Sequence, residues 1–374
     1  MKILITDPIE QSCVDILTRE GFHVDLKPGL PAEEIKAIIH EYAALVVRSG
    51  TKVTADIIEK ATSMKVIGRA GAGVDNIDSA AASRKGIIVM NTPGGNTLST
   101  AEHTFSMLMA VARNIPNAHA SLVAGRWDRK KFMGTELYGK TLGIVGMGKI
   151  GREVALRAQA FGMTTIGFDP VLGPEVGAKM NVELVPLEEI YRRSDFITVH
   201  TPLSDETRGL LNDESIAKCK KGVRLINCAR GGIIDEAALL KALDSGQVAG
   251  AALDVFVEEP PKDFTLAKHP KVVATPHLGA STEEAQEKVA IQIAEQIADA
   301  LKDRGIVGAV NAAALQAGVP NEIKPYLLLA EKIGALQAQV MKGQLKELSV
   351  ELTGELLQKH SELIKAGVLR GLFS

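Results

Sequence analysis

The sequence predicts an α/β protein with two α/β domains and a cleft between them, followed by a partial α+β segment. Short apolar runs that end in turn residues alternate with helical segments along most of the chain, which indicates strands followed by helices. These runs are continuously apolar, as expected for parallel strands buried on both faces. The length of 374 residues also favours more than one domain.

The first predicted domain is discontinuous and comprises residues 1–96 and 282–310. Its strands are predicted from KILITD, ALVVRSG, MKVIGRAG and IIVMNTP, and helical segments such as PAEEIKAIIHEY and TADIIEKAT separate them. The segment 281–305 has apolar residues at helical spacing and acids in its first turn, so it predicts one long helix. We expect this helix to return the chain to the first domain.

The second predicted domain comprises residues 97–281. It begins with one long helix, expected from about residue 97 through residue 125, with a Ser/Thr start and Glu102 placed as the acid of a capping box. Six strands are then predicted, from TLGIVGMG, TTIGFDP, DFITVHTP, RLINCARGG, GAALDVF and KVVATPH.

The pattern changes after residue 310. KPYLLLAEKIGALQAQVM and SELIKAGVLRGLF predict helices, whereas LKELSVELTGEL alternates like a strand. A single strand needs partners from elsewhere, so we expect residues 311–374 to be the start of an incomplete C-terminal domain.

Composition excludes several classes of protein. A hydrophobic content of 46% with 24% charged residues is typical of a globular protein, and a net charge of -2 argues against nucleic acid as the main partner. The three cysteines show no metal-binding or disulfide spacing. The N-terminus does not resemble a secretory signal, and no apolar run reaches membrane-spanning length. We therefore expect a cytoplasmic protein without a metal site.

A glycine motif in the second domain predicts a dinucleotide site. Gly146, Gly148 and Gly151 form G-x-G-x-x-G after a strand and at the start of a helix, where backbone N–H groups can bind a pyrophosphate. Asp169 ends the next strand, and a carboxylate there accepts hydrogen bonds from ribose hydroxyls and repels a 2′-phosphate. The motif therefore predicts a Rossmann-like domain that binds NAD.

A second glycine cluster, GRAGAGVDNID, lacks a clear helix after it. Its residues could present successive backbone N–H groups as an anion-binding nest, or could form an ordinary turn. The candidates for the nest are Gly71, Ala72, Gly73, Val74 and Asp75.

Hydride transfer to a carbonyl also needs a proton donor. His277 and His200 both follow a predicted strand, at the edge where open α/β sheets bind ligands. Glu259 precedes two prolines in a loop at another strand end and could reach His277, which favours His277. Arg230 also ends a strand, where it could grip a substrate carboxylate or form an ion pair with an acid such as Asp254.

Together these motifs resemble the D-isomer specific 2-hydroxyacid dehydrogenase family, in which GMGKIG, Asp169, HTPL, NCARGG, ALDVF and TPHLGAST occur in this order. The runs VVRSGTKVTADII, VIGRAGAGVDNID, VMNTPGGNTLSTAEHT and RKKFMGTEL resemble the branch of that family that acts on 3-phosphoglycerate. The resemblance implies two Rossmann-like or flavodoxin-like domains. It also implies NAD-dependent oxidation of 3-phospho-D-glycerate to 3-phosphohydroxypyruvate, the first step of the phosphorylated pathway of L-serine biosynthesis.

The resemblance assigns roles to individual residues. Arg230 would bind the substrate carboxylate and carbonyl, His277 would exchange the hydroxyl proton, and Glu259 would support His277. Further substrate-binding positions are Arg48, Arg69, Gly73, Val74 and Arg129, the last reaching into the partner subunit's cleft. Positions that match dinucleotide contacts are Lys149, Ile150, Thr201, Cys228, Ala229, Arg230, Asp254, His277, Gly279 and Ala280, with Ala72 standing where a hydroxyl residue is common.

Two other functions stay open at this point. One is a dehydrogenase or reductase of another 2-hydroxy acid, such as glyoxylate, hydroxypyruvate or 2-oxoglutarate, and the other is an NAD-sensing, corepressor-like binding protein. The basic residues of the first domain favour the phosphorylated substrate. We expect a homodimer or homotetramer, with Trp127 and the apolar stripe TFSMLMAVA at the interface. Residues 311–374 resemble the start of an intervening or regulatory domain, so feedback control by serine is not assumed.

Overall fold

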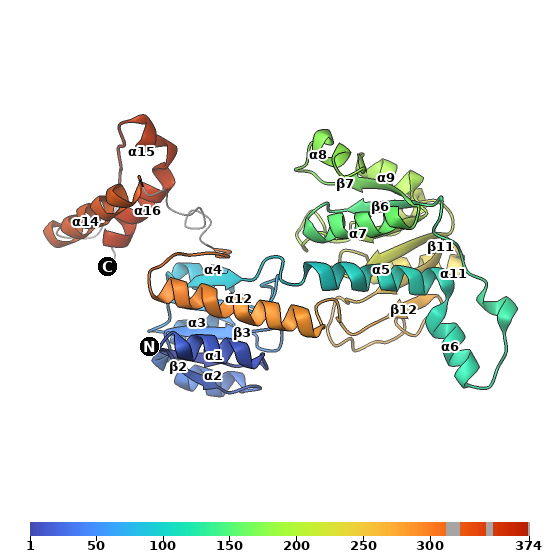
Figure 1. Cartoon of the computed structure of the whole chain (residues 1–374), viewed down its shortest axis with the longest axis horizontal. Coiled ribbons are helices and arrows are strands. Elements are labelled where there is room, and N and C mark those ends of the chain that lie inside the picture. The colour runs from blue at the N-terminus through green and yellow to red at the C-terminus, as the bar shows by residue number, and fades with distance from the viewer. Residues whose placement is uncertain (312–321, 342–346, 373–374) are drawn as a thin grey trace. The chain divides into compact units, whose positions relative to one another are not determined.

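The computed structural model describes residues 1–311, 322–341 and 347–372. The chain divides into two compact units, one of Met1–Pro93 with Glu287–Ser374 and one of Gly94–Gln286. Each unit contains a parallel sheet with helices on both faces, so the predicted pair of α/β domains is confirmed (Figure 1). None of the helices in the described ranges combines the length and the apolar character that crossing a membrane requires.

The first unit contains a five-stranded parallel sheet. The strand order β2-β1-β3-β4-β5 is that of flavodoxin-like folds. The strands are β1 (Lys2–Ile5), β2 (His23–Leu26), β3 (Ala44–Val47), β4 (Val66–Arg69) and β5 (Ile88–Asn91).

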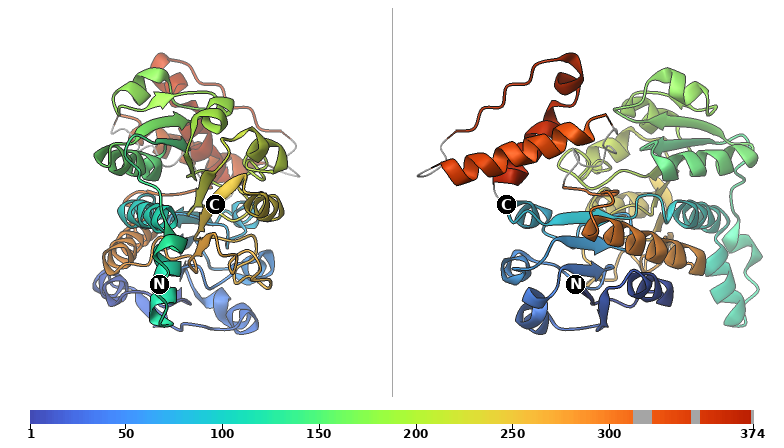
Figure 2. Two further views of the ribbon diagram at one scale, coloured as in Figure 1. Left: turned by 90° about the vertical axis from the view of Figure 1, so that its right-hand side faces the viewer. Right: turned by 60° about the vertical axis from the view of Figure 1, so that its left-hand side comes forward.

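Helices cover both faces of this sheet (Figure 2). One face packs against α1 (Gln11–Arg19) and α12 (Glu283–Leu301), and the long helix expected at 281–305 is therefore present. A side chain at Gly68 of β4 would lie 2.5 Å from Ile297, so a glycine is needed where α12 crosses the strand. The other face packs against α2 (Ala32–Ile38), the 3-10 turn η1 (Ile39–Glu41), α3 (Ala55–Lys60) and α4 (Ser79–Arg84).

The second unit contains a seven-stranded parallel sheet. Its order, β12-β11-β10-β9-β6-β7-β8, reverses direction between β6 and β9, and this is the point at which a Rossmann sheet binds its dinucleotide. The strands are β6 (Thr141–Val145), β7 (Thr164–Phe168), β8 (Glu183–Leu184), β9 (Phe196–Val199), β10 (Val223–Asn227), β11 (Val248–Leu253) and β12 (Val272–Ala274).

Two hydrophobic cores enclose this sheet. On one face, α5 (Thr97–Arg113) and α7 (Lys149–Ala160) pack against residues such as Leu142, Phe196 and Ile226. On the other face, α9 (Leu187–Arg193), α10 (Asp213–Lys218) and α11 (Glu236–Ser245) pack against the alternate side chains of the same strands. The remaining elements of this unit are α6 (Ile115–Val123), α8 (Pro174–Ala178) and the 3-10 turn η2 (Arg129–Phe132).

The long helix expected from residue 97 to 125 is interrupted. Asn114 adopts the left-handed conformation, with φ of 54°, and α6 then begins with a proline in its first turn. The predicted capping box is also wrong, because the N-cap is Asn96 and the Ser99 hydroxyl donates to the Asn96 carbonyl instead. Glu102 lies beyond the first turn of α5 and pairs with Arg157 of α7.

The apolar stripe of α5 is core and does not form an exposed interface. Phe105, Leu108 and Val111 are buried against the sheet of their own unit. Large apolar side chains are exposed further along the chain, and they include Leu122, Val123, Trp127, Met133 and Tyr138. Because Trp127 is exposed, its place at a subunit interface stays a prediction. The prediction that the apolar stripe of α5 lies at such an interface is wrong.

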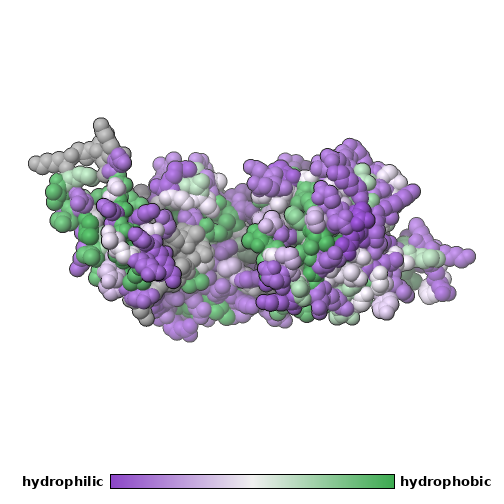
Figure 3. Space-filling view, turned by 90° about the horizontal axis from the view of Figure 1, so that it is seen from above, coloured by the Kyte–Doolittle hydropathy of each residue, from purple (hydrophilic) through white to green (hydrophobic). Residues whose placement is uncertain are grey.

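The C-terminal segment contains three helices in its described part. It contains α14 (Lys324–Val340), α15 (Glu355–Lys359) and α16 (Ser361–Leu372). Gly334 and Gly371 permit backbone contact between α14 and α16, since side chains there would lie about 2 Å from Val368 and Glu331 carbonyl oxygens. Hydrophobic residues gather where α14 lies, at the left of Figure 3. They include the exposed Tyr326, Leu329, Ile333, Leu336 and Val340.

The strand expected at LKELSVELTGEL is absent from its described part. Residues 347–354 are irregular and α15 begins at Glu355, whereas residues 345 and 346 lie outside the described ranges. Val350 and Leu352 pack against the small core formed by α14 and α16, so their alternation reflects contacts with helices.

Candidate active site

The glycine motif forms a tight turn between β6 and α7. Gly146 has φ of 94°, and a side chain there would lie 2.8 Å from the His200 carbonyl group. A side chain at Gly151 would lie 2.1 Å from the Gly146 carbonyl oxygen, so only glycine lets the helix approach the turn. At Gly148, by contrast, a side chain would meet no atom within 4 Å.

The space at Gly148 fits a pyrophosphate. Gly148 is the N-cap of α7 and its position carries no side-chain cap, so the first N–H groups of Lys149 and Ile150 face the ligand side of the turn. The buried hydroxyl oxygen of Thr201 has no hydrogen-bond partner among the described residues. An orphaned polar atom beside an open turn is consistent with a polar ligand.

Asp169 follows β7 at the edge of this turn. Its two carboxylate oxygens accept hydrogen bonds from the backbone N–H groups of Met147, at 2.9 Å, and Val171, at 3.0 Å. These bonds fix the carboxylate beside the glycine turn, and each oxygen has a further lone pair for a ribose hydroxyl. A carboxylate at this position can accept hydrogen bonds from ribose hydroxyls and repels a 2′-phosphate.

The loop that follows β12 carries His277 next to Glu259. The His277 Nδ1 atom lies 2.7 Å from the Glu259 Oε2 atom, and both side chains are partly exposed. His277 has φ of 55°, an uncommon conformation for a residue with a side chain, which must be maintained by its surroundings. This pair had been predicted from the placement of both residues at strand ends.

The Glu259 carboxylate is held in its charged form. Burial raises the pKa of Glu259. Hydrogen bonds from His277 and the Phe256 N–H group, together with the charges of His277 and Arg230, lower it by a larger amount, so the pKa lies below its ordinary value. A carboxylate partner favours the imidazolium and fixes the orientation of the ring.

His200 is not suited to the same task. Its ring nitrogen Nε2 lies 3.0 Å from the Thr198 hydroxyl, and burial lowers the pKa of His200 to about 4. Such an imidazole stays neutral at physiological pH. His277, which the sequence already favours over His200, therefore remains the candidate for proton exchange.

Arg230 lies in a turn shaped by its neighbours. The Asn227 side chain accepts a hydrogen bond from the Ala229 N–H group and donates one to the Arg230 carbonyl. A side chain at Gly231 would lie 1.9 Å from the Phe256 carbonyl oxygen, so glycine brings this turn against the loop that carries Glu259. The acid whose pKa the Arg230 charge lowers is accordingly Glu259.

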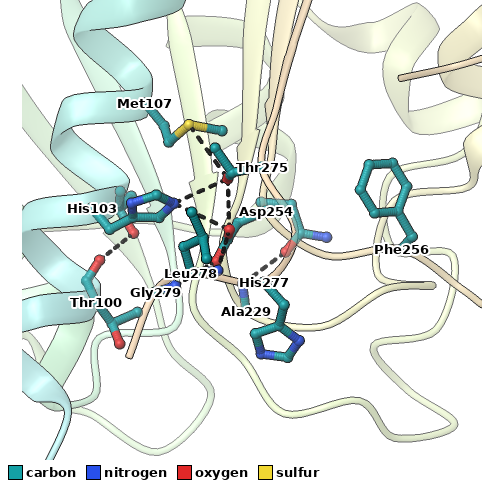
Figure 4. A network of polar contacts seen from close by, with 12 residues as sticks. Thr100, His103, Met107, Ala229, Asp254, Phe256, Thr275, His277, Leu278 and Gly279 are labelled. Carbon is teal, nitrogen blue, oxygen red and sulfur yellow. Dashed lines mark hydrogen bonds and ion pairs between the residues drawn. The ribbon is translucent and has the colours of Figure 1, made fainter. Parts of the chain in front are cut away.

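Asp254 is the centre of a buried network at the end of β11 (Figure 4). Its Oδ1 atom accepts from the Thr275 hydroxyl at 2.6 Å and from the Leu278 N–H group at 2.7 Å, and its Oδ2 atom accepts from the Gly279 N–H group at 2.8 Å. The side chain is fully buried, and the expected contact of Asp254 with a dinucleotide stays a prediction. Its contribution is to hold the loop after His277.

Cys228 lies beside this network. Burial and the Asp254 charge raise the pKa of the Cys228 thiol to about 12. Cys228, His103 and Asp254 place potential metal-ligand atoms within 4.8 Å of one another, and the Asp254 carboxylate already accepts hydrogen bonds from Thr275, Leu278 and Gly279. The side chain of Cys228 is itself buried, so a cofactor could meet only its backbone.

In the first unit, the loop after β4 is held by its carbonyl groups. Backbone N–H groups donate to two of these carbonyls, that of Thr92 to Gly71 and that of Ile77 to Val74. Side chains donate to the other two, the Asn91 amide to the Ala72 carbonyl and Arg69 Nη1 to the Gly73 carbonyl. In a trans peptide the N–H group points opposite to the preceding carbonyl. The N–H groups of Ala72, Gly73 and Val74 therefore point outward, and within the described ranges they donate to no protein acceptor.

Arg48 and Arg69 lie next to this loop. Arg69 Nε donates to the Arg48 carbonyl oxygen at 3.2 Å. The buried Arg48 Nε atom has no hydrogen-bond partner among the described residues, although Arg48 Nη1 lies 3.5 Å from the Pro8 carbonyl oxygen. Burial lowers the pKa of Arg48, and the charges of Asp7 and Glu10 oppose this shift.

Two other predicted positions are Arg129 and Ala280. Arg129 is exposed on η2, in the unit that carries His277, and stays a prediction. The Ala280 carbonyl accepts from the Gln286 side chain.

Four residues that sequence reasoning missed organise these groups. His103 and Thr275 contact Asp254, Asp7 accepts from Arg48 N–H and Thr51, and the Asn76 side chain donates to the Arg48 and Thr51 carbonyls. His103 and Thr275 lie 172 positions apart, so no local pattern could have paired them. The one available signal was Asp7, an acid directly after the first apolar run.

Comparison with known proteins places these features in a family. Residues 105–279 match the family model of the D-isomer specific 2-hydroxyacid dehydrogenase NAD-binding domain, and residues 322–374 match that of the D-3-phosphoglycerate dehydrogenase intervening domain. D-3-phosphoglycerate dehydrogenase of Rattus norvegicus is 54% identical over 99% of this chain and 70% of its own length. The enzyme of the same name from Bacillus subtilis is 49% identical over the same shares.

A solved structure adds the same likeness in three dimensions. D-lactate dehydrogenase of Aquifex aeolicus, in complex with NAD and lactic acid, superimposes with a TM-score of 0.72 at 26% identity over 81% of this chain and 96% of its own. The chain therefore belongs to the D-3-phosphoglycerate dehydrogenases of the D-isomer specific 2-hydroxyacid dehydrogenase family.

Proposed function

We propose that this chain catalyses NAD-dependent oxidation of 3-phospho-D-glycerate to 3-phosphohydroxypyruvate, the first step of the phosphorylated pathway of L-serine biosynthesis. The observation that carries the proposal is the 2.7 Å contact between His277 and Glu259, beside Arg230 and in the same unit as the glycine turn. Relatives about half identical along the chain bear the name of this activity.

In the proposed mechanism, His277 accepts the proton of the substrate 2-hydroxyl group as the C2–H bond breaks. Bound NAD supplies the acceptor for the hydride. Glu259 stabilises the imidazolium that results and holds the ring through Nδ1, which leaves Nε2 for the substrate. Arg230 grips the substrate carboxylate with its planar guanidinium and polarises the developing carbonyl group.

NAD as the cofactor rests on Gly148, Thr201 and Asp169. Gly148 leaves room for the pyrophosphate, the Thr201 hydroxyl lacks a protein partner, and the Asp169 carboxylate is aligned for ribose hydroxyls. Backbone groups that follow β6, β10 and β12 would also contact the cofactor, and they belong to Lys149, Ile150, Ala229 and Gly279. A matched family model that describes an NAD-binding domain supports this assignment.

We propose that the first unit recognises the phosphate. The buried Nε atom of Arg48 has no partner within the described part of the chain, and Arg69 lies next to Arg48. The outward N–H groups of Gly73 and Val74 would add an anion-binding nest. A phosphate would satisfy this set of donors, whereas glyoxylate offers no second anion. Arg129 is proposed to reach the site of a partner subunit.

The decisive experiment compares three substrates. NADH formation is measured with 3-phospho-D-glycerate, unphosphorylated D-glycerate and 2-hydroxyglutarate at equal concentrations. We expect the phosphorylated substrate to be preferred and His277→Ala to lose most of its turnover. Equal rates on all three substrates would refute the phosphate assignment, and turnover that survives in His277→Ala would refute the proton-transfer assignment.

The NAD-sensing alternative predicts a different result. A corepressor-like binding protein would bind NADH with little turnover of any of these acids, so the same assay separates the two functions. Arg48 and Arg69 favour the enzyme, because a dinucleotide sensor has no need of a second anion site in the other unit.

We also propose a cytoplasmic homodimer or homotetramer. Exposed Leu122, Val123 and Trp127 favour contact with a second copy of the chain. Light scattering on the purified protein tests this proposal, and a monomer at micromolar concentration would contradict it.

A further inference from the structure

His103 is a half-buried titratable group that the proposed mechanism does not use. It lies on α5, and its Nε2 atom is 3.1 Å from Asp254 Oδ1 and 3.1 Å from the Thr275 hydroxyl oxygen. The Thr275 hydroxyl already donates to Asp254. Both neighbours of Nε2 therefore offer it lone pairs, and His103 must present its proton at this nitrogen.

Asp254 connects His103 to the loop of His277. The carboxylate accepts from the N–H groups of Leu278 and Gly279, and the His277 N–H group donates to the Asp254 carbonyl at 2.9 Å. The His277 ring itself points away from the network, as Figure 4 shows. The hydrogen bond to the Asp254 carbonyl thus holds the left-handed backbone conformation of His277.

A buried carboxylate needs all its donors to remain charged. Burial raises the pKa of Asp254, whereas hydrogen bonds from His103, Thr275 and Leu278, together with the His103 charge, lower it below its usual range. The titratable groups that face Asp254 are His103, from α5, and Cys228, from the turn after β10. The Cys228 thiol stays neutral because its pKa is raised to about 12.

We propose that His103 is a positioning residue, whose Nε2–H group completes the donor set of Asp254 and thereby holds Leu278, Gly279 and the preceding His277 in place. This inference rests on the proposed function of His277 in proton exchange. It assigns His103 no contact with the substrate or the cofactor.

The test compares two substitutions of His103. His103→Leu removes the donor and keeps an apolar side chain, whereas His103→Gln restores an N–H donor. Val111→Ala is the matched control, because Val111 is buried on the same helix but packs in the core. For each variant, kcat and KM for 3-phospho-D-glycerate are measured between pH 5.5 and 9, and hydrogen exchange is measured on residues 275–282 of the free protein.

In His103→Leu we expect kcat to fall about tenfold through misplacement of His277, with KM changed much less. The acid limb of the kcat profile should move to higher pH, because Asp254 with fewer donors protonates more readily. The Leu278 and Gly279 amides should exchange faster. His103→Gln should recover most of each change, and Val111→Ala should lower Tm while leaving the profile and the exchange of this loop unaltered.

A His103→Leu variant with the wild-type kcat profile and unchanged exchange at Leu278 and Gly279 would overturn the proposal. Failure of the proposed function has a different signature, namely a wild-type protein that does not oxidise the substrate or a His277→Ala variant that still does. The exchange measurement tests the link from His103 to the loop in either case. If His103→Leu does not fold, His103→Asn replaces it, since the shorter amide cannot contact both partners.

Discussion

The Glu259 carboxylate lies 2.7 Å from the His277 ring, and its pKa is shifted below the ordinary range by that partner and by Arg230, against the opposing effect of burial. A carboxylate with a lowered pKa in the folded state stabilises the protein above its unfolded pKa, of about 4.3. This stabilisation is lost as the pH falls through the lowered value.

Glu259→Gln should therefore lower Tm at pH 7, and the difference from wild type should shrink as the pH falls below about 4. Thermal unfolding of both proteins between pH 7 and pH 3 measures it. Glu258→Gln is the control, because Glu258 is an exposed neighbour whose ion pair is with Lys262. A Tm difference between the two proteins that stays constant with pH would show that the Glu259 charge does not contribute to stability.

Two glycines of the same turn should respond differently to alanine. Gly148→Ala places a methyl group in open space, so Tm should be nearly unchanged while NADH binds about tenfold more weakly. Gly151→Ala forces a methyl group to 2.1 Å from a carbonyl oxygen and should cost about 1–3 kcal/mol of stability. Fluorescence titration and thermal unfolding check the pair, and equal effects on Tm would contradict the assignment.

Asp169 should set the preference for NAD. In Asp169→Asn the shape is retained but the negative charge is lost, so kcat/KM for NAD should fall about tenfold and that for NADP should rise. The ratio of the two values is the measurement. An unchanged ratio would mean that Asp169 serves only the Met147 and Val171 N–H groups.

Arg48 should matter only for the phosphate. Arg48→Gln should reduce kcat/KM for 3-phospho-D-glycerate by about a hundredfold, as expected for a charge-assisted hydrogen bond, and should leave D-glycerate nearly unaffected. Lys52→Gln is the control, an exposed cation four positions along the chain. Parallel losses on both substrates would instead indicate a general structural role for Arg48.

Much of the fold follows from local patterns. Continuous apolar runs predicted the inner strands of both parallel sheets, because a strand buried on both faces has little freedom in its composition. The edge strands β2 and β8 were missed, because they are only partly buried and carry no such run. The interruption at Asn114 was missed because asparagine is tolerated within helices and adopts the left-handed conformation only in some contexts. The alternation at Val350 and Leu352 was misread because packing against helices can produce the same pattern.

The candidate site could be predicted where its residues follow the carboxyl ends of strands. Glu259 and His277 both follow strands of one parallel sheet, and strand ends of such a sheet share an edge. His103 was not predictable in this way, because it meets Asp254 across the interface of a helix and the sheet. Contacts of that kind depend on the crossing of whole elements, which no single motif encodes.

The loop at residues 71–74 is fastened through main-chain oxygen atoms, and the methyl group of Ala72 takes no part in this fastening. A substitution at position 72 can therefore change the contacts with a ligand while the carbonyl hydrogen bonds of the loop stay in place. Ligand preference at this point of the chain is open to evolutionary adjustment through one side chain.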